Sequence, residues 1–450
     1  MLNSRAAYFV LFTSYFFLAS CSLQKKINTT AQQDIITVDG LRNAHIGISV
    51  YEPATGKYWY NYQADKYFVP ASNTKLFTCY AGMKYLGDSL TGIRYTETNK
   101  GILLLPTGDP TLLHPDFKQH RVIEFLQKST KDITISGAAW KDEALGFGWA
   151  WDDYNSSYMA ERSPLPVYGN IIRFVQTQTA AQADAVTNKP ETTIYTDPEI
   201  DWKLSFNPDA GSKTFSVERK RDENIFMVTQ GAEKYKELEV PYATNGLTSA
   251  LQLLKDTVGK AITLVTERPI TPPAIFQVIH SQRTDSLFRP MMHRSDNFFA
   301  EQTLLMVSNE RLGVMDDSKI IDTLLKTDLK DLPQRPHWVD GSGLSRYNLF
   351  TPQDFVYLLN KMKNEFAWQR ITTILATGDE GTLKNYYKAD SNFIYAKTGT
   401  LSGHVAISGY LITRNNKTLI FSVLVNNHQT SATAVRRAVE KFIEGLRNNY

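Results

Sequence analysis

The chain has 450 residues, with 49 lysines and arginines against 46 aspartates and glutamates, and a net charge of +3. A dedicated nucleic-acid-binding protein carries a clear basic excess, so this near-neutral balance predicts no nucleic-acid partner. A hydrophobic fraction of 42% and only two cysteines indicate a large globular protein that does not depend on a framework of disulfides.

The N-terminal segment has the pattern of a bacterial secretory signal. One positive charge precedes an apolar run over 6–19, which is short for a membrane-spanning helix. The run ends in Leu-Ala-Ser-Cys at Cys21, which resembles a lipobox, in which the cysteine is acylated. We therefore predict a signal peptide over 1–20, a lipid on Cys21 and a linker over 21–40, on an extracytoplasmic protein anchored at a membrane facing the periplasm or cell wall. An ordinary signal peptide with a chance cysteine is the alternative.

A hairpin and a helix follow the linker. The segments 45–51 and 57–62 read as strands on either side of a Pro-Ala-Thr-Gly turn. Over 72–86, apolar residues recur at helical spacing. This predicted helix contains Cys79, which has no partner if Cys21 is acylated, and we expect a buried, unreactive thiol.

The middle of the chain differs from its ends in predicted secondary structure. Short strands alternate with Gly, Pro and Asp turns over 95–240, which predicts a β-rich insertion. Helices are then predicted at 248–258, 297–309 and 351–366, followed by strands at 393–396, 404–413 and 419–426 and a helix at 432–446. Strands at both ends with helices between them predict an α+β fold, in which an antiparallel sheet joins the termini and is flanked by helices.

Three short motifs carry the chemistry. They are Ser72-Asn-Thr-Lys75, Ser295-Asp-Asn297 and Lys397-Thr398-Gly399-Thr400. Together they form the signature of penicillin-binding proteins and class A β-lactamases, although each is weak alone. Their order and their predicted contexts, two at helix starts and one at the end of a strand, make chance agreement of all three improbable.

The first motif has a physical rationale as a nucleophile and its base. Residues three apart on a helix face the same way, so the Lys75 amine can reach the Ser72 hydroxyl. Lysine can act as the base if burial or a nearby cation such as Lys397 lowers its pKa. The backbone N–H groups of Ser72 and Thr400 can form an oxyanion hole. For each motif in isolation a plain helix cap, a solvated lysine or an ordinary turn is the alternative. The chain has no Gly-x-Ser-x-Gly, His-Glu-x-x-His or Cys-x-x-Cys, so we predict neither a metal nor a cofactor.

Beyond the trio, the chain resembles a known family. The matching segments are 70–75, 108–110, 151–153, 340–352 and 396–410. They are similar to class C low-molecular-mass penicillin-binding proteins, the D-alanyl-D-alanine carboxypeptidase/endopeptidases of the penicillin-binding protein 4 type. The resemblance implies a penicillin-recognising serine transpeptidase/β-lactamase-like fold with a large insertion. The catalytic domain would then be split over 41–94 and 241–450, around an accessory domain over 95–240.

The resemblance also implies a mechanism on peptidoglycan stem peptides. Ser72 would be acylated by the D-Ala-D-Ala carbonyl, with Lys75 as general base. Ser295 would pass a proton to the leaving amine, and Asn297 would hold the substrate backbone. The terminal carboxylate would be bound by the third motif, Lys397, Thr398, Gly399 and Thr400. β-Lactams would inhibit the enzyme by leaving Ser72 acylated.

Two further groups are implied near the site. A loop with Asp340, Ser342 and Arg346 would shape its edge. Asp152 or Asp153 would recognise the amino group of a diaminopimelate side chain, with plain surface carboxylates as the alternative. For the whole chain, the alternatives are a serine β-lactamase or esterase on the same fold and a non-catalytic cell-wall-binding lipoprotein. The sequence leaves open the choice between carboxypeptidase and endopeptidase, and between one and two accessory subdomains.

Overall fold

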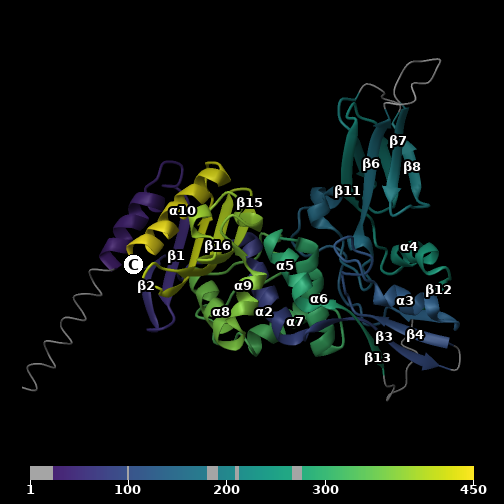
Figure 1. Cartoon of the computed structure of the whole chain (residues 1–450), viewed down its shortest axis with the longest axis horizontal. Helices are drawn as coiled ribbons and strands as arrows, with labels where there is room; N and C mark the ends of the chain where they lie inside the picture. The colour runs from purple at the N-terminus through teal and green to yellow at the C-terminus, as the bar shows by residue number, and fades with distance from the viewer. Residues whose placement is uncertain (1–23, 99–100, 180–190, 208–211, 266–275) are drawn as a thin grey trace, which may run out of the picture.

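The structure is a computed structural model that describes residues 24–98, 101–179, 191–207, 212–265 and 276–450. The predicted signal peptide and Cys21 lie outside the described residues. A sheet-and-helix module holds both ends of the described chain, and the insertion projects from its opposite side (Figure 1). In the described segments, no helix combines the length and apolarity that crossing a bilayer requires.

The module is built on a six-stranded antiparallel sheet with the order β14-β15-β16-β17-β1-β2. Its strands are β1 (His45–Glu52), β2 (Lys57–Tyr62), β14 (Ala376–Thr377), β15 (Ile394–Leu401), β16 (His404–Ile412) and β17 (Thr418–Asn426). The first strand pairs with the last, from His45 opposite Asn426 to Tyr51 opposite Ile420. The predicted antiparallel sheet that joins the termini is therefore confirmed.

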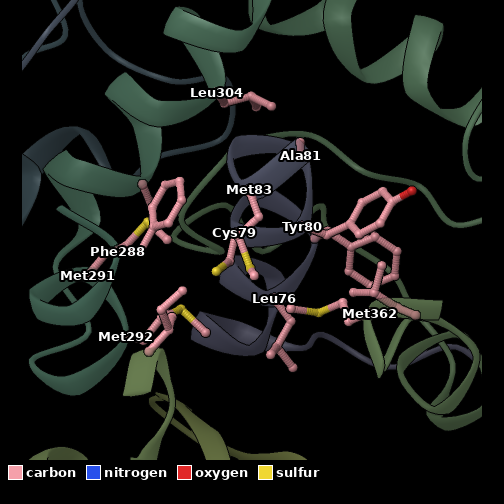
Figure 2. Packing of buried hydrophobic residues seen from close by; sticks show 14 of the residues in the cluster. Leu76, Cys79, Tyr80, Ala81, Met83, Phe288, Met291, Met292, Leu304 and Met362 are labelled. Carbon is pink, nitrogen blue, oxygen red and sulfur yellow. The ribbon is translucent and has the colours of Figure 1, made fainter. Parts of the chain in front are cut away.

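Helices cover both faces of this sheet. The helices of the module are α2 (Lys75–Tyr85), α5 (Thr284–His293), α6 (Asn297–Leu312), α7 (Asp317–Lys326), α8 (Pro352–Glu365), α9 (Trp368–Ile374) and α10 (Ala432–Asn449). Helix α10 packs on one face, whereas α2 and its neighbours form a separate core on the other. Helix α2 lies at the centre of that core, where Leu76, Cys79 and Met83 meet side chains from α5, α6 and α8 (Figure 2). Cys79 is a free thiol with no exposed surface, as predicted, and burial raises its pKa to about 12.

The linker expected over 21–40 is folded from residue 24 on. Residues 24–31 are helical and continue into a π-helix at Gln32–Ile36. Ile27, Ala31 and Ile35 are buried in the same core as α10. Because these residues are spaced by four, they form one apolar stripe along a helix. Burial of this stripe explains why the segment folds despite the polar composition that suggested a linker.

The strands of the insertion form two groups, which lie at opposite ends of the insertion (Figure 1). One is a five-stranded sheet, β12-β5-β4-β3-β13, accompanied by α3 (Arg121–Lys128) and α4 (Thr248–Val258). Its strands are β3 (Ser89–Thr98), β4 (Gly101–Pro106), β5 (Ile133–Ser136), β12 (Ile262–Val265) and β13 (Gln277–Arg283). The other comprises β6 (Ile171–Thr179), β7 (Glu191–Asp197), β8 (Lys203–Phe206), β9 (Ser216–Arg219), β10 (Ile225–Thr229) and β11 (Tyr235–Pro241), which form two three-stranded sheets. One apolar core runs through both groups.

Strand pairing shifts the boundaries expected for the insertion. Residues 241–283 were expected in the catalytic module, yet β12 pairs with β5 and β13 pairs with β3. A division of the chain by its sheets would therefore extend the insertion from 95–240 to 89–283. The chain enters through β3 and leaves through β13, which lie side by side and antiparallel.

Candidate active site

Ser72 lies on a tight turn that leads into α2. Residues Ala71–Thr74 form a 3-10 turn, and the α-helix begins at Lys75 rather than at Ser72. Ala71 has a φ of 49°, a left-handed conformation that costs energy for a residue with a Cβ and is enriched at functional sites. The turn leaves Ser72 partly exposed while Lys75 is fully buried.

The Lys75 amine is held by three oxygens. Its Nζ lies 2.9 Å from Ser72 Oγ, 2.6 Å from Asn297 Oδ1 and 2.8 Å from the Ser342 carbonyl oxygen. A neutral amine has two N–H donors and one lone pair. With the donors directed at Asn297 and Ser342, the lone pair is left for the Ser72 hydroxyl proton. The predicted proximity of Ser72 and Lys75 is present, and it extends to the second motif and to the loop.

The surroundings of Lys75 favour the neutral amine. Burial lowers the pKa of Lys75 to about 8, against the opposing charges of Asp340, Glu301 and Asp296. Lysine ordinarily titrates near 10.4, so a much larger fraction of this amine is unprotonated near neutral pH. This is the property that a lysine general base requires.

The second motif opens α6. The Asp296 side chain caps the helix by accepting from the Phe299 N–H at 2.9 Å. Ser295, just before the cap, has a φ of 63°. Asn297 is fixed on both sides, because its Nδ2 donates to the Tyr158 carbonyl at 2.9 Å while its Oδ1 accepts from Lys75.

The third motif lies inside a strand and not at its end. The strand was expected to stop at Ala396, but β15 continues to Leu401 because every motif residue pairs with β16. Lys397 is fully buried, and its Nζ donates to Ser295 Oγ at 2.8 Å and to the Thr398 carbonyl at 2.6 Å. Burial, together with Lys75 and Arg436, holds the pKa of Lys397 well below its usual range.

Gly399 allows the strand to touch the nucleophile turn. A Cβ at this position would come within 2.6 Å of the Pro70 carbonyl oxygen and 3.0 Å of the Ser72 nitrogen. Only glycine fits so close an approach of two backbones. The Ser72 N–H and the exposed end of β15 at Thr400 therefore lie beside one another.

The loop expected at the edge of the site supports Lys75 directly. Its buried Asp340 accepts from the backbone N–H groups of Gly343 and Ser345 and from the side chains of Asn348 and Trp149. These bonds shape the turn that presents the Ser342 carbonyl to Lys75. The exposed Arg346 donates to the Ser402 carbonyl at 3.3 Å, so it reaches the turn after β15.

Glu301 is a site residue that lies outside the three sequence motifs. It is fully buried on α6, one turn after Asn297, and its Oε1 accepts from the Ser342 N–H at 2.7 Å. Its other oxygen lies 3.5 Å from Arg162 Nη1, which comes from the insertion. Burial and the nearby Asp340 raise the pKa of Glu301 to about 8. The spacing of four residues between Asn297 and Glu301 was the available signal for a shared helix face.

Asp152 and Asp153 lie on a short 3-10 turn, Trp151–Asn155, in the insertion. Neither residue lines the cavity of about 540 Å³ that borders Ser295, Asn297 and Tyr158. Asp153 interacts with the Tyr158 side chain and raises its pKa, after the larger effect of burial. A role for either carboxylate in substrate recognition remains a prediction. Within the described segments, no group of three or more His, Cys, Asp or Glu side chains is arranged to hold a metal ion.

Comparisons with known proteins identify the family and the fold of the chain. The model of the D-Ala-D-Ala carboxypeptidase 3 (S13) family matches residues 24–449. The D-alanyl-D-alanine carboxypeptidase of Actinomadura sp. (strain R39) is 26% identical, over 91% of this chain and 84% of that protein. The crystal structure of penicillin binding protein 4 from Haemophilus influenzae has a TM-score of 0.69 at 18% identity, covering 93% of this chain and 98% of that one. A second structure of that protein, in complex with a β-lactam, has a TM-score of 0.64 at 18% identity, with the same coverage. The chain therefore belongs to the D-Ala-D-Ala carboxypeptidase 3 (S13) family.

Proposed function

We propose that Ser72 is the nucleophile with which this serine-type D-Ala-D-Ala carboxypeptidase cleaves peptidoglycan stem peptides. The observation that carries the assignment is the fully buried Lys75 amine, 2.9 Å from Ser72 Oγ, with its two other contacts made to hydrogen-bond acceptors. In this arrangement the amine accepts the Ser72 proton as Oγ attacks the D-Ala-D-Ala carbonyl. The oxyanion would be held by the backbone N–H groups of Ser72 and Thr400.

The second and third motifs supply the remaining steps. When the peptide C–N bond breaks, the leaving amine takes a proton through Ser295, whose Oγ accepts a hydrogen bond from Lys397. The terminal D-Ala departs, and water hydrolyses the ester on Ser72 to restore the hydroxyl. Thr398 and Thr400 would bind the terminal carboxylate, and Asn297 the substrate backbone. A β-lactam would acylate Ser72 in the same way, in line with the β-lactam complex of the Haemophilus protein.

Penicillin labelling tests the assignment. The full-length protein in detergent is incubated with labelled penicillin and with a pentapeptide stem, and both reactions are followed by mass spectrometry. We expect a stable adduct on Ser72 that Ser72→Ala abolishes, together with release of D-Ala. Rapid turnover of penicillin would indicate a β-lactamase, and the absence of any adduct would indicate a non-catalytic binding protein. A cross-linked muropeptide in the same assay measures endopeptidase activity.

We also propose that a lipid on Cys21 holds the protein at a membrane. The described chain starts at residue 24 with a helix packed beside α10. An acyl chain only three residues earlier would keep this face of the module close to the bilayer, with the insertion pointing away (Figure 1). Metabolic labelling with an alkyne fatty acid should mark the wild type and not Cys21→Ala. An unmodified Cys21 in the mature protein, or processing that is insensitive to globomycin, would exclude the anchor.

A further inference from the structure

Arg436 connects the C-terminal helix to the strand that carries the third motif. It lies in the second turn of α10, and its Nη2 donates to Thr400 Oγ1 at 2.6 Å. Thr400 is exposed, whereas Arg436 is partly buried. A helix that otherwise packs on the apolar face of the sheet thus sends one guanidinium to the open end of the candidate site.

The charge of Arg436 is not neutralised. Among the residues that the structure describes, no carboxylate lies within ion-pairing distance of its guanidinium, and its buried Nε–H has no acceptor. The next residue, Arg437, differs in this respect, because it pairs with Glu440 and donates to the Asn385 carbonyl. A planar guanidinium with unused donors suits a carboxylate, which it can bind through two parallel hydrogen bonds.

The other cations of the site are already engaged. Lys75 contacts three oxygens and faces the buried Asp340 and Glu301. Lys397 has no exposed surface and is bonded to Ser295 and to the Thr398 carbonyl. The guanidinium of Arg436, by contrast, contacts Thr400 directly. Arg346 is directed instead at Ser402, beyond the end of the strand.

We infer that Arg436 binds the terminal carboxylate of the substrate, together with the hydroxyls of Thr398 and Thr400, and so determines the preference for a free C-terminus. This inference rests on the proposed function, because it needs a peptide bound along β15. A substrate that ends in an amide would lack the negative charge and would gain nothing from the guanidinium. Arg436 is thus a specificity-determining residue that none of the three motifs contains.

Paired substrates test the inference. The kcat and KM of the full-length protein are measured on a stem peptide that ends in D-Ala-D-Ala and on the same peptide with a C-terminal amide. We expect the wild type to prefer the acid. Arg436→Ala should lower kcat/KM for the acid on the order of 10- to 100-fold, mainly through KM, and leave the amide within about twofold. Arg436→Lys should restore part of the loss, because it keeps the charge but not the planar fork.

Arg437→Ala is the matched control, since it removes a neighbouring guanidinium that is already paired. It should keep the wild-type ratio of acid to amide. An unchanged ratio in Arg436→Ala would overturn the inference, even if both rates fell together, because a merely structural defect affects both substrates. Acylation by benzylpenicillin and by its methyl ester gives a second readout with the same expectation. If the wild type were acylated by penicillin but cleaved neither peptide, the carboxypeptidase assignment would be wrong. The comparison of benzylpenicillin with its methyl ester would still test whether Arg436 binds a carboxylate.

Discussion

Lys75 combines full burial with three specific contacts, and these two features set its chemistry. The contacts orient the amine, and burial lowers its pKa to about 8. The opposing charges of Asp340 and Glu301 prevent a larger fall. The result is an amine that is correctly placed and about half neutral near pH 8, where an exposed lysine is almost fully protonated.

The pH dependence of acylation should report this amine. Only neutral Lys75 can accept the Ser72 proton, so the second-order rate constant for acylation should fall about tenfold per pH unit below pH 8 and level off above it. Lys75→Arg keeps the charge but stays protonated, and it should lower the rate on the order of 10²–10⁴-fold at every pH. Stopped-flow measurements with a fluorescent penicillin from pH 6 to pH 10 provide the test. A flat profile, or an active Lys75→Arg, would rule out Lys75 as the base.

At the scale of secondary-structure elements, the site depends on two backbones in direct contact. The turn before α2 meets β15 at Gly399, and Gly343 packs on the same turn, where a Cβ would come within 1.9 Å of the Ala71 carbonyl oxygen. These contacts fix the distance between the nucleophile and the strand along which we propose that the substrate binds.

Gly399→Ala tests that contact. The added methyl group must push β15 away from the Ser72 N–H, because backbone atoms on the facing turn cannot move as a side chain can. A displacement of about 1 Å commonly costs on the order of 10² in rate, so acylation should fall by that factor while the circular dichroism spectrum is unchanged. Gly445→Ala in α10 is the control, since its Cβ would make an ordinary contact at 3.6 Å. Equal acylation rates in the two variants would contradict a role for the close approach.

The N-terminal segment is a second element with a measurable contribution. Ile35 has no exposed surface, and truncating a buried isoleucine typically costs about 2–5 kcal/mol. Ile35→Ala should therefore lower the melting temperature clearly, whereas Gln33→Ala, on the exposed side of the same segment, should leave it nearly unchanged. Differential scanning calorimetry of both variants makes the comparison. Equal melting temperatures would mean that residues 24–36 add nothing to the stability of the module.

Local signals explain which elements the sequence could predict. The strands of the hairpin at 45–62 and the helix after Ser72 depend on alternation and helical spacing, and both occur close to the predicted positions. The continuation of β15 through Gly399 was missed, because pairing with β16 outweighs the turn propensity of glycine. Helix α5 was missed because Pro290 lies within it.

The contacts of the candidate site likewise include some that local sequence predicts and some that it does not. Ser72 and Lys75 are three residues apart, so their contact follows from helix geometry alone. Glu301 and Arg436 reach partners that are 41 and 36 positions away. The helical spacing from Asn297 places Glu301 on the same face of α6, but no local pattern encodes its contact with Ser342 or that of Arg436 with Thr400.

At the scale of the whole molecule, the insertion and the catalytic module share a buried ionic cluster. Arg162 from the insertion lies 2.6 Å from Asp142, 2.5 Å from Asp317 at the start of α7 and 3.5 Å from Glu301. The Arg162 side chain is only 2% exposed. Since Glu301 also accepts from the Ser342 N–H, the cluster connects the insertion to the loop that supports Lys75.

Arg162→Met tests this connection. Removing the cation leaves three carboxylates close together without their common partner, and breaking a buried ion pair typically costs about 3–5 kcal/mol. We expect a markedly lower melting temperature. We also expect slower acylation well below that temperature, because Glu301 would no longer hold Ser342 in place. Arg221→Met is the control, since Arg221 is exposed and its partner Asp222 lies 3.8 Å away. Equal melting temperatures and acylation rates in Arg162→Met and Arg221→Met would contradict this connection. The position of Lys75 would then be maintained by the catalytic module without a contribution from the insertion.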